Sequence, residues 1–225
     1  AEGNTKPLYH YLSQPEITEA EASARFCDML HYTGGPGYIV HMTCEGALNA
    51  VRKATFRNQK VFVETCSQYL MIDASLYEKE DGHKWVMSPP LREKKDQKAL
   101  WSGINQGLVQ VVGTDHCPFN WDQKMMGKDD FSKIPNGHPA IEHRREFMYS
   151  EGVRKGKISH TKFVEVCSTN AAKIFGMYPR KGTIAIGADA DIVVFDPNKK
   201  HVISVDNHHM NCDYSGYEGW EVTGK

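Results

Sequence analysis

Short apolar runs alternate with amphipathic segments along the middle of this chain, and that alternation limits the folds that it can adopt. Strands are expected from 37 to 43, from 60 to 66 and from 109 to 115. Between them, apolar residues recur at helical spacing, which predicts one helix around 47–54 and another around 100–108. Strands that alternate with helices form parallel β/α units. The predicted fold class is therefore α/β, either a doubly wound sheet or part of a (β/α)8 barrel.

The pattern changes near residue 180. Before it, a short helix is expected to begin after Ser159 and to meet a second one near Ser168, and the second ends at Gly176, which suits a helix C-terminus. After it, two short strands are expected around a turn at Gly187, and a third begins at His201. We therefore expect a boundary near residue 180, with a small β region after it.

Composition excludes several classes of partner. The 225 residues include 27 Lys and Arg against 28 Asp and Glu, a formal net charge of -1, so a nucleic-acid-binding surface is not expected. No stretch approaches the ~18 apolar residues of a membrane span. The six cysteines are dispersed without a CxxC pair, which is typical of reduced thiols. We expect a soluble, cytoplasmic protein that binds neither nucleic acid nor membrane.

Two candidate metal ligands stand where predicted strands end. His41 and Asp115 each follow an apolar run, and in parallel β/α folds that edge gathers catalytic and metal-binding side chains. Taken singly, a polar residue at a strand end is more often a cap or a turn. Imidazole and carboxylate together suit Zn²⁺ or a similar ion, but a zinc centre needs three or four protein donors. The eleven histidines contain neither an HxH pair nor an HExxH helix.

Two loops could present backbone groups to a ligand. Ser88 lies in Met-Ser-Pro-Pro-Leu-Arg and Asn136 in Ile-Pro-Asn-Gly-His-Pro, where Pro and Gly fix the backbone. On composition alone both are simply turns. The stretch between Cys117 and Gly137 lacks periodicity, and a loop of that length is usually a lid or a subunit contact. Most of the remaining histidines in polar or loop contexts are expected to be solvated: His10, His31, His83, His138, His143, His160 and His201.

Several long runs resemble the D-hydantoinase and dihydropyrimidinase family of cyclic amidohydrolases, and together they cover nearly the whole chain. They are VQVVGTDHCPF at 109–119, KIPNG at 133–137, STNAAKIFG at 168–176, YPRKGTIAIGADADIVVFD at 178–196 and YEGWEVTG at 217–224.

The resemblance implies a (β/α)8 barrel that holds two divalent metal ions, usually zinc, bridged by a carbamylated lysine and a hydroxide. The family's ligands are an HxH pair, that lysine, two later histidines and one aspartate. By resemblance His41 is the second later histidine, and Asp115 is the aspartate, both ligand and proton carrier. Ser88 and Asn136 correspond to loop positions that hold the cyclic ureide or imide. The family also implies a homotetramer.

The same resemblance predicts that part of the site lies outside this chain. Family members read His-Ala-Glu-Asn-Gly around the first later histidine, and the chain opens with Ala1-Glu2-Gly3-Asn4. The HxH pair and the carbamylated lysine are expected upstream. We therefore expect an incomplete C-terminal fragment, inactive alone, with part of the barrel in 1–180 and part of a small β-sandwich in 181–225.

The expected activity of the parent enzyme is metal-dependent hydrolysis of a dihydropyrimidine or 5-substituted hydantoin to an N-carbamoyl amino acid. Two alternatives remain. One is a non-catalytic relative that keeps the barrel for assembly, against which the presence of His41 and Asp115 argues. The other is an allantoinase or dihydroorotase, although the Ser-Pro-Pro-Leu-Arg and Pro-Asn-Gly segments favour the hydantoinase branch.

Overall fold

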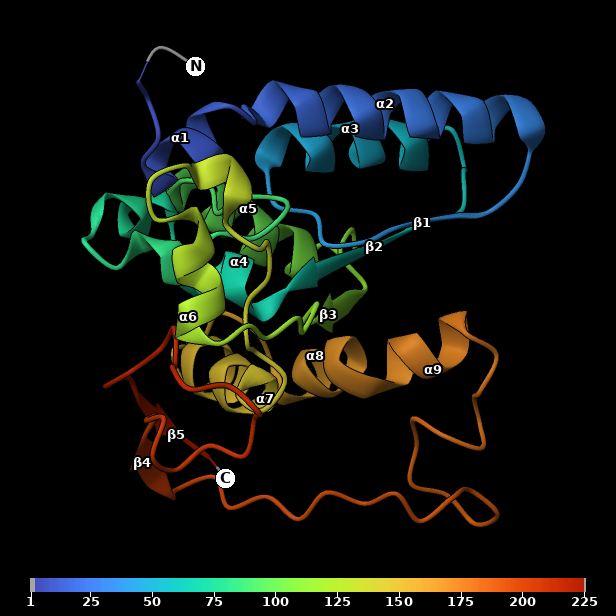
Figure 1. The fold of residues 1–225 in the computed structure, drawn as a ribbon. Helices are drawn as coiled ribbons and strands as arrows, with labels where there is room; N and C mark the ends of the chain where they lie inside the picture. The colour runs from blue at the N-terminus through green and yellow to red at the C-terminus, as the bar shows by residue number, and fades with distance from the viewer. Residues whose placement is uncertain (1–2, 225) are drawn as a thin grey trace.

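The structure, a computed structural model, describes residues 3–224 and is built around a three-stranded parallel sheet (Figure 1). The strands are β1 (Gly37–Ile39), β2 (Val61–Cys66), β3 (Val111–Gly113), β4 (Lys200–Val202) and β5 (Glu221–Thr223). The α-helices are α1 (Pro7–Leu12), α2 (Glu16–Thr33), α3 (Glu45–Phe56), α4 (Ser67–Met71), α5 (Lys94–Asn105), α6 (Trp121–Lys124), α7 (Arg144–Phe147), α8 (His160–Val164) and α9 (Asn170–Ile174). Short 3-10 turns cover Ala74–Glu78, Gly82–Trp85, Met125–Gly127 and Phe131–Lys133, and π-helical stretches cover Met148–Val153 and Glu165–Thr169.

The parallel sheet has the order β1-β2-β3, so β2 is its central strand. Gly37 pairs with Val61, and Glu64 pairs with Val111. The connections between successive strands contain α3 and then α5, as parallel strands require. All three strands therefore end at one edge, and the polar residues that follow them lie there too.

Apolar faces of the two crossover helices form the core with the sheet. The helical spacing predicted from the sequence is confirmed, because the apolar residues that recur at that spacing within α3 and α5 are buried. Burying a Leu, Ile or Val side chain contributes about 1.5–3 kcal/mol. The central residues of this core are Leu48, Val51, Val63, Leu100, Ile104 and Val112.

The two helices expected to meet near Ser168 form one continuous helical run instead. α8 passes through the π-helical stretch Glu165–Thr169 directly into α9, and Figure 1 shows them in line. The start and end were predicted correctly, because the Ser159 side chain accepts a hydrogen bond from the Lys162 amide and Gly176 has φ +72°. A local widening of the helix replaces the expected break.

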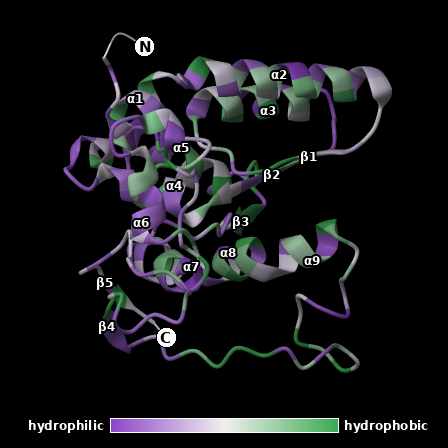
Figure 2. Ribbon diagram, in the orientation of Figure 1, coloured by the Kyte–Doolittle hydropathy of each residue, from purple (hydrophilic) through white to green (hydrophobic). Residues whose placement is uncertain are grey.

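The strand pair expected around Gly187 is absent from the described residues. Residues 183–198 contain no strand, and they form a long excursion away from the sheet in Figure 1. Figure 2 shows that this excursion carries a hydrophobic stretch, and Ile184, Ile186 and Val194 are 87%, 108% and 92% exposed. The expected strand from His201 does form, as β4, and it pairs antiparallel with β5. The boundary near residue 180 stays a prediction.

Two further observations concern the chain as a whole. Within residues 3–224, no helix is long and apolar enough to cross a membrane. All six cysteines are free thiols, and four of them, Cys27, Cys44, Cys66 and Cys212, are buried.

Candidate functional site

His41 lies just beyond β1 in a backbone conformation that few residues adopt. Its φ is +40°, in the left-handed region, where a side chain other than glycine costs energy. The next residue is held on two sides, because the Met42 amide donates to the Glu64 carbonyl at 2.8 Å and the Met42 carbonyl accepts from Thr65 Oγ1 at 2.7 Å. The loop is therefore fixed against β2 with its imidazole at the carboxyl edge of the sheet.

Asp115 is held in a similar way beyond β3. Its φ is +46°. On one side, the buried Gln68 donates from Nε2 to the Thr114 carbonyl at 2.9 Å. On the other side, His116 Nδ1 accepts a hydrogen bond from the Ala140 amide at 3.2 Å. The backbone of His116 also forms an isolated parallel β-bridge with that of His138. His41, Asn58 and Asp115 are the non-glycine residues with positive φ among residues 3–224. Strained backbones of this kind cluster at functional sites.

The two candidate ligands occupy the same end of the same sheet, as their strand-end positions predicted. The strands that carry them are not neighbours, because β2 lies between them. His41 is half-buried and Asp115 is exposed, so both are accessible from the edge. Their joint role as metal ligands stays a prediction.

Ser88 and Asn136 meet although 48 positions separate them. The Ser88 hydroxyl donates to Asn136 Oδ1 at 3.3 Å. Behind this pair, the Gly137 amide donates to the Val86 carbonyl at 3.1 Å. A side chain at position 137 would collide with the Cys117 carbonyl, so only glycine allows this close approach. The two predicted substrate-binding loops therefore form one surface, on which the Ser88 and Asn136 side chains are exposed to solvent.

His41 and Ser88 line one cavity of about 280 Å³. Pro89 and Arg92 from the Ser88 loop, and Glu19 from the first turns of α2, complete much of its wall. Asp115 is not among the residues that line it. The cavity joins one predicted metal ligand to one predicted substrate-binding loop.

A buried ion pair in this wall was not predicted from the sequence. Arg92 and Glu19 lie 3.2 Å apart, with side chains 4% and 15% exposed. Both also bind Thr43, two residues after His41: its amide donates to Glu19 Oε1 at 2.7 Å, and Arg92 Nε donates to its hydroxyl at 3.0 Å. Arg92 lies within the Ser-Pro-Pro-Leu-Arg motif, and that was the available signal. Nothing local indicates that Glu19 reaches across from α2.

The expectation that most other histidines are solvated was wrong for four of them. His10, His83, His138 and His143 are buried. His10 belongs to the neighbourhood of the site, because its Nε2 lies 2.8 Å from the Met87 carbonyl, next to Ser88. Burial lowers the pKa of His10 from its usual value. Polar sequence context was a poor guide because these side chains are covered by elements distant in the sequence.

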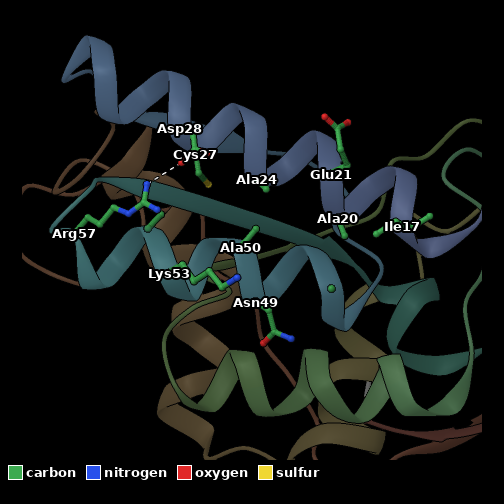
Figure 3. Close-up of a pocket in the computed structure, with 12 residues that line it drawn as sticks. Ile17, Ala20, Glu21, Ala24, Cys27, Asp28, Asn49, Ala50, Lys53 and Arg57 are labelled. Atoms are coloured by element: carbon green, nitrogen blue, oxygen red, sulfur yellow. Dashed lines mark hydrogen bonds and ion pairs between the residues drawn. The ribbon is translucent and has the colours of Figure 1, made fainter.

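A second cavity, of about 370 Å³, lies between α2 and α3 (Figure 3). Its wall includes Ile17, Ala24 and Lys53, and an ion pair of 2.7 Å joins Arg57 to Asp28 at one end. None of the predicted site residues lines it. Its lining residues come from α2, α3 and Arg57, and none of them follows a strand of the parallel sheet.

Donor chemistry at the sheet edge suits a divalent metal but does not complete a site. An imidazole and a carboxylate are suitable donors. Within residues 3–224, no group of three or more His, Cys, Asp or Glu side chains is arranged to hold an ion. Ala1 and Glu2, the first residues of the motif that resembles His-Ala-Glu-Asn-Gly, lie outside the described residues.

A parallel β/α sheet with these residues at its carboxyl edge defines an α/β protein, of the barrel or doubly wound type, whose candidate ligand site lies at the ends of the strands. The chain belongs to the amidohydrolase family, whose model matches residues 39–219.

Two curated relatives are D-hydantoinases. That of Geobacillus stearothermophilus is 47% identical over 227 aligned residues, covering 100% of this chain and 48% of the relative. That of Rhizobium radiobacter is 44% identical and is covered to 50%. The chain thus spans about half the length of the curated relatives it matches.

Solved structures agree with this assignment. Dihydropyrimidinase from Brevibacillus agri NCHU1002 superposes with a TM-score of 0.98 at 50% identity, over 100% of this chain and 49% of that structure. L-Hydantoinase from Arthrobacter aurescens gives 0.91 at 30% identity, over 99% and 49%. The predicted fold class, part of a (β/α)8 barrel, is confirmed.

Proposed function

We propose that this chain forms part of a metal-dependent enzyme that hydrolyses a cyclic amide to an N-carbamoyl amino acid. The substrate class is a dihydropyrimidine or a 5-substituted hydantoin. The observation that carries the proposal is the placement of His41 and Asp115 at the edge that also presents the Ser88–Asn136 pair. The identity of 47% to a D-hydantoinase supports the choice of reaction.

His41 and Asp115 would hold divalent metal ions together with donors from outside these 225 residues. By resemblance those donors are an HxH pair and a carbamylated lysine, and the ions are two zincs. When bound, such ions polarise the scissile carbonyl and lower the pKa of the attacking water. The metal dependence that is general in the amidohydrolase family supports this part of the proposal.

The chain's own residues would orient the ring and move one proton. Backbone groups beside Ser88 and Asn136 hold the ureide. The Asp115 carboxylate accepts the proton of the attacking water as the new C–O bond forms. It then donates that proton to the ring nitrogen as the C–N bond breaks, so the products are an open-chain ureido group and a carboxylic acid, which releases the second proton of the water to solvent and becomes the carboxylate. The exposed position of Asp115 leaves it accessible to water and substrate.

We also propose that the protein is cytoplasmic, which its six free cysteines support. A homotetramer is proposed from the family resemblance. Size-exclusion chromatography with light scattering on the protein at its full natural length tests the assembly directly.

Ring opening is the test of the function itself. The protein at full natural length is loaded with zinc and assayed on dihydrouracil and 5-substituted hydantoins, with the N-carbamoyl product quantified. We expect turnover, and a loss on the order of 10³-fold in Asp115→Asn. Asp129→Asn, which changes an exposed carboxylate in the segment that follows, is the control and should keep full activity.

Two results would count against the proposal. Absence of ring opening in a zinc-loaded, assembled protein would favour the non-catalytic alternative. Equal activity in Asp115→Asn and Asp129→Asn would remove Asp115 from the reaction.

A further inference from the structure

Lys124 is a fully buried lysine at the end of α6, with an exposed fraction of 0%. Its ammonium donates to three backbone carbonyls, those of Val86 at 2.8 Å, Pro135 at 2.6 Å and Gly137 at 2.8 Å. A lysine ammonium has three N–H donors, so this set of acceptors satisfies it completely. Lysine is almost never fully buried without a partner, and here the partners are backbone carbonyls from two separate loops.

The positions of these carbonyls connect Lys124 to the site. Pro135 and Gly137 stand on either side of Asn136, and Val86 precedes Ser88 by two residues. The carbonyls face the interior while the Ser88 and Asn136 side chains face solvent. One ammonium thus holds both loops from behind, at the point where the Gly137 amide also binds the Val86 carbonyl.

We propose that Lys124 is a positioning residue that fixes the spacing between the Ser88 and Asn136 loops and thereby sets the shape of the surface that receives the substrate ring. The role in ring binding rests on the function proposed above. The fixing of the two loops rests on the hydrogen bonds alone.

Physical chemistry explains why a lysine is needed there. Burial opposes the charge and lowers the pKa of Lys124 to about 7, while the three carbonyls favour the ammonium form. The Phe119 ring, whose centroid lies 5.4 Å from Nζ, adds a favourable contact. An apolar side chain would avoid the cost of desolvation but would leave three carbonyls without this donor. Only a long side chain with three donors can join all three.

The same arrangement bears on the segment between Cys117 and Gly137, which was expected to be a lid or a subunit contact. Lys124 lies inside that segment and is bonded to both loops. Ile134 within it is also buried. The segment therefore serves as a fixed wall at this point, and any lid motion is confined to its exposed residues.

The first test separates positioning from general stability by steady-state kinetics on the protein at full natural length. Lys124→Met keeps the chain length and removes the donors. We expect KM for dihydrouracil to rise about 10-fold or more, with a smaller change in kcat and an unchanged metal content. Lys128→Met changes an exposed lysine of the same segment and should alter neither constant. Ile104→Ala destabilises the core away from the site and should lower the active fraction, and hence kcat, at constant KM.

The second test does not depend on activity. Amide hydrogen exchange is compared between the wild type and Lys124→Met under conditions where both are folded. We expect exchange to accelerate about 10-fold or more at 86–88 and 136–138, including the Gly137 amide, with the central sheet unchanged. Uniform acceleration throughout the chain, or unchanged exchange in these loops, would overturn the proposal.

The two tests fail separately. If the wild type opens no ring while loop exchange still accelerates, the proposed function fails and the fixing of the loops by Lys124 stands. If the wild type is active and KM and loop exchange are both unchanged in Lys124→Met, Lys124 is not a positioning residue.

Discussion

The parallel sheet and the segment 183–198 have similar sequence patterns, but the first forms paired, buried strands and the second forms no strand. Both contain apolar residues in short β-type runs. In the sheet, Val63 and Val112 are completely buried, with 0% of each exposed. In the segment, Ile186 is 108% exposed, and no strand forms.

The difference shows that an apolar run specifies a strand only when a partner is available. β1, β2 and β3 pair with one another, and α3 and α5 cover apolar residues of the sheet. Residues 183–198 have no paired strand in the described part of the chain. Phe195 packs against Tyr149, with ring centroids 4.7 Å apart, but Ile184, Ile186 and Val194 stay exposed. An isolated two-stranded hairpin is at best marginally stable in water, so the local pattern cannot fold by itself.

The largest expected effect concerns the parallel sheet, where Asp115 follows β3 in a strained backbone conformation. Asp115→Gly removes an unfavourable φ of +46° together with the carboxylate. We expect turnover to fall on the order of 10³-fold while the free energy of unfolding stays equal or rises by up to about 1 kcal/mol. Asn58→Gly is the matched control, because it relieves a φ of +57° away from the site. It should give the same stability and full turnover, measured by urea unfolding and ring-opening assay.

The opposite outcome for Asp115→Gly is informative. A marked loss of stability would mean that the Asp115 side chain holds the edge of the sheet together, and its strain would then have a structural reason.

A second prediction compares the stability contributions of the two regions. Ile104→Ala in the buried face of α5 should lower the free energy of unfolding of the 225-residue chain by about 2–5 kcal/mol. Ile186→Ser in the exposed segment should change it by less than about 0.5 kcal/mol. In the protein at full natural length we expect the Ile186→Ser cost to increase, because additional sequence can supply the missing partner. If Ile186→Ser lowers the free energy of unfolding equally in the 225-residue chain and in the full-length protein, the exposed segment does not form a strand with a partner from additional sequence.

The smallest expected effect concerns the joint between the sheet and the C-terminal strands. His138 is buried against Tyr217, with ring centroids 5.0 Å apart, and burial lowers the pKa of His138 from 6.5 to about 3. The unfolded chain therefore takes up this proton between pH 6.5 and pH 3 while the folded chain does not. The contribution of His138 to the free energy of unfolding is fully present above pH 6.5. It is lost as pH falls, by up to about 1.4 kcal/mol per pH unit.

Urea unfolding of the wild type and of His138→Gln between pH 7 and pH 4.5 measures this slope. The variant should show a shallower loss of stability on acidification. His31→Gln, at an exposed position of α2, should keep the wild-type slope. An unchanged slope in His138→Gln would show that His138 does not stay neutral in the folded chain.

Most of the sheet and much of the candidate site could be predicted from the sequence, for a local reason. His41 and Asp115 follow their own strands, and parallel pairing brings all strand ends to one edge. Asn136 and Ser88 are in loops stiffened by Pro and Gly, which resemblance to known enzymes singled out. Their mutual hydrogen bond required the structure, because 48 residues separate them.

The parts that escaped prediction depend on contacts across the fold. Glu19 reaches Arg92 and Thr43 from a different helix, and Lys124 reaches the Val86 carbonyl, 38 residues away. Neither residue differs locally from an ordinary solvated charge. The failure at Gly187 is the converse, because a convincing local pattern lacks the partner that would make it a strand.

The most direct test of the central claim, that this chain supplies His41 and Asp115 to a metal site completed by donors from elsewhere, is a count of bound metal. Zinc is measured by elemental mass spectrometry after dialysis, for the 225-residue chain and for the protein at full natural length, and ring opening is assayed on the same samples. We expect two tightly held ions and turnover for the full-length protein, and weakly held, substoichiometric metal without turnover for the 225 residues alone. Stoichiometric, tightly held metal with full turnover in the 225-residue chain would show that these residues hold a complete site.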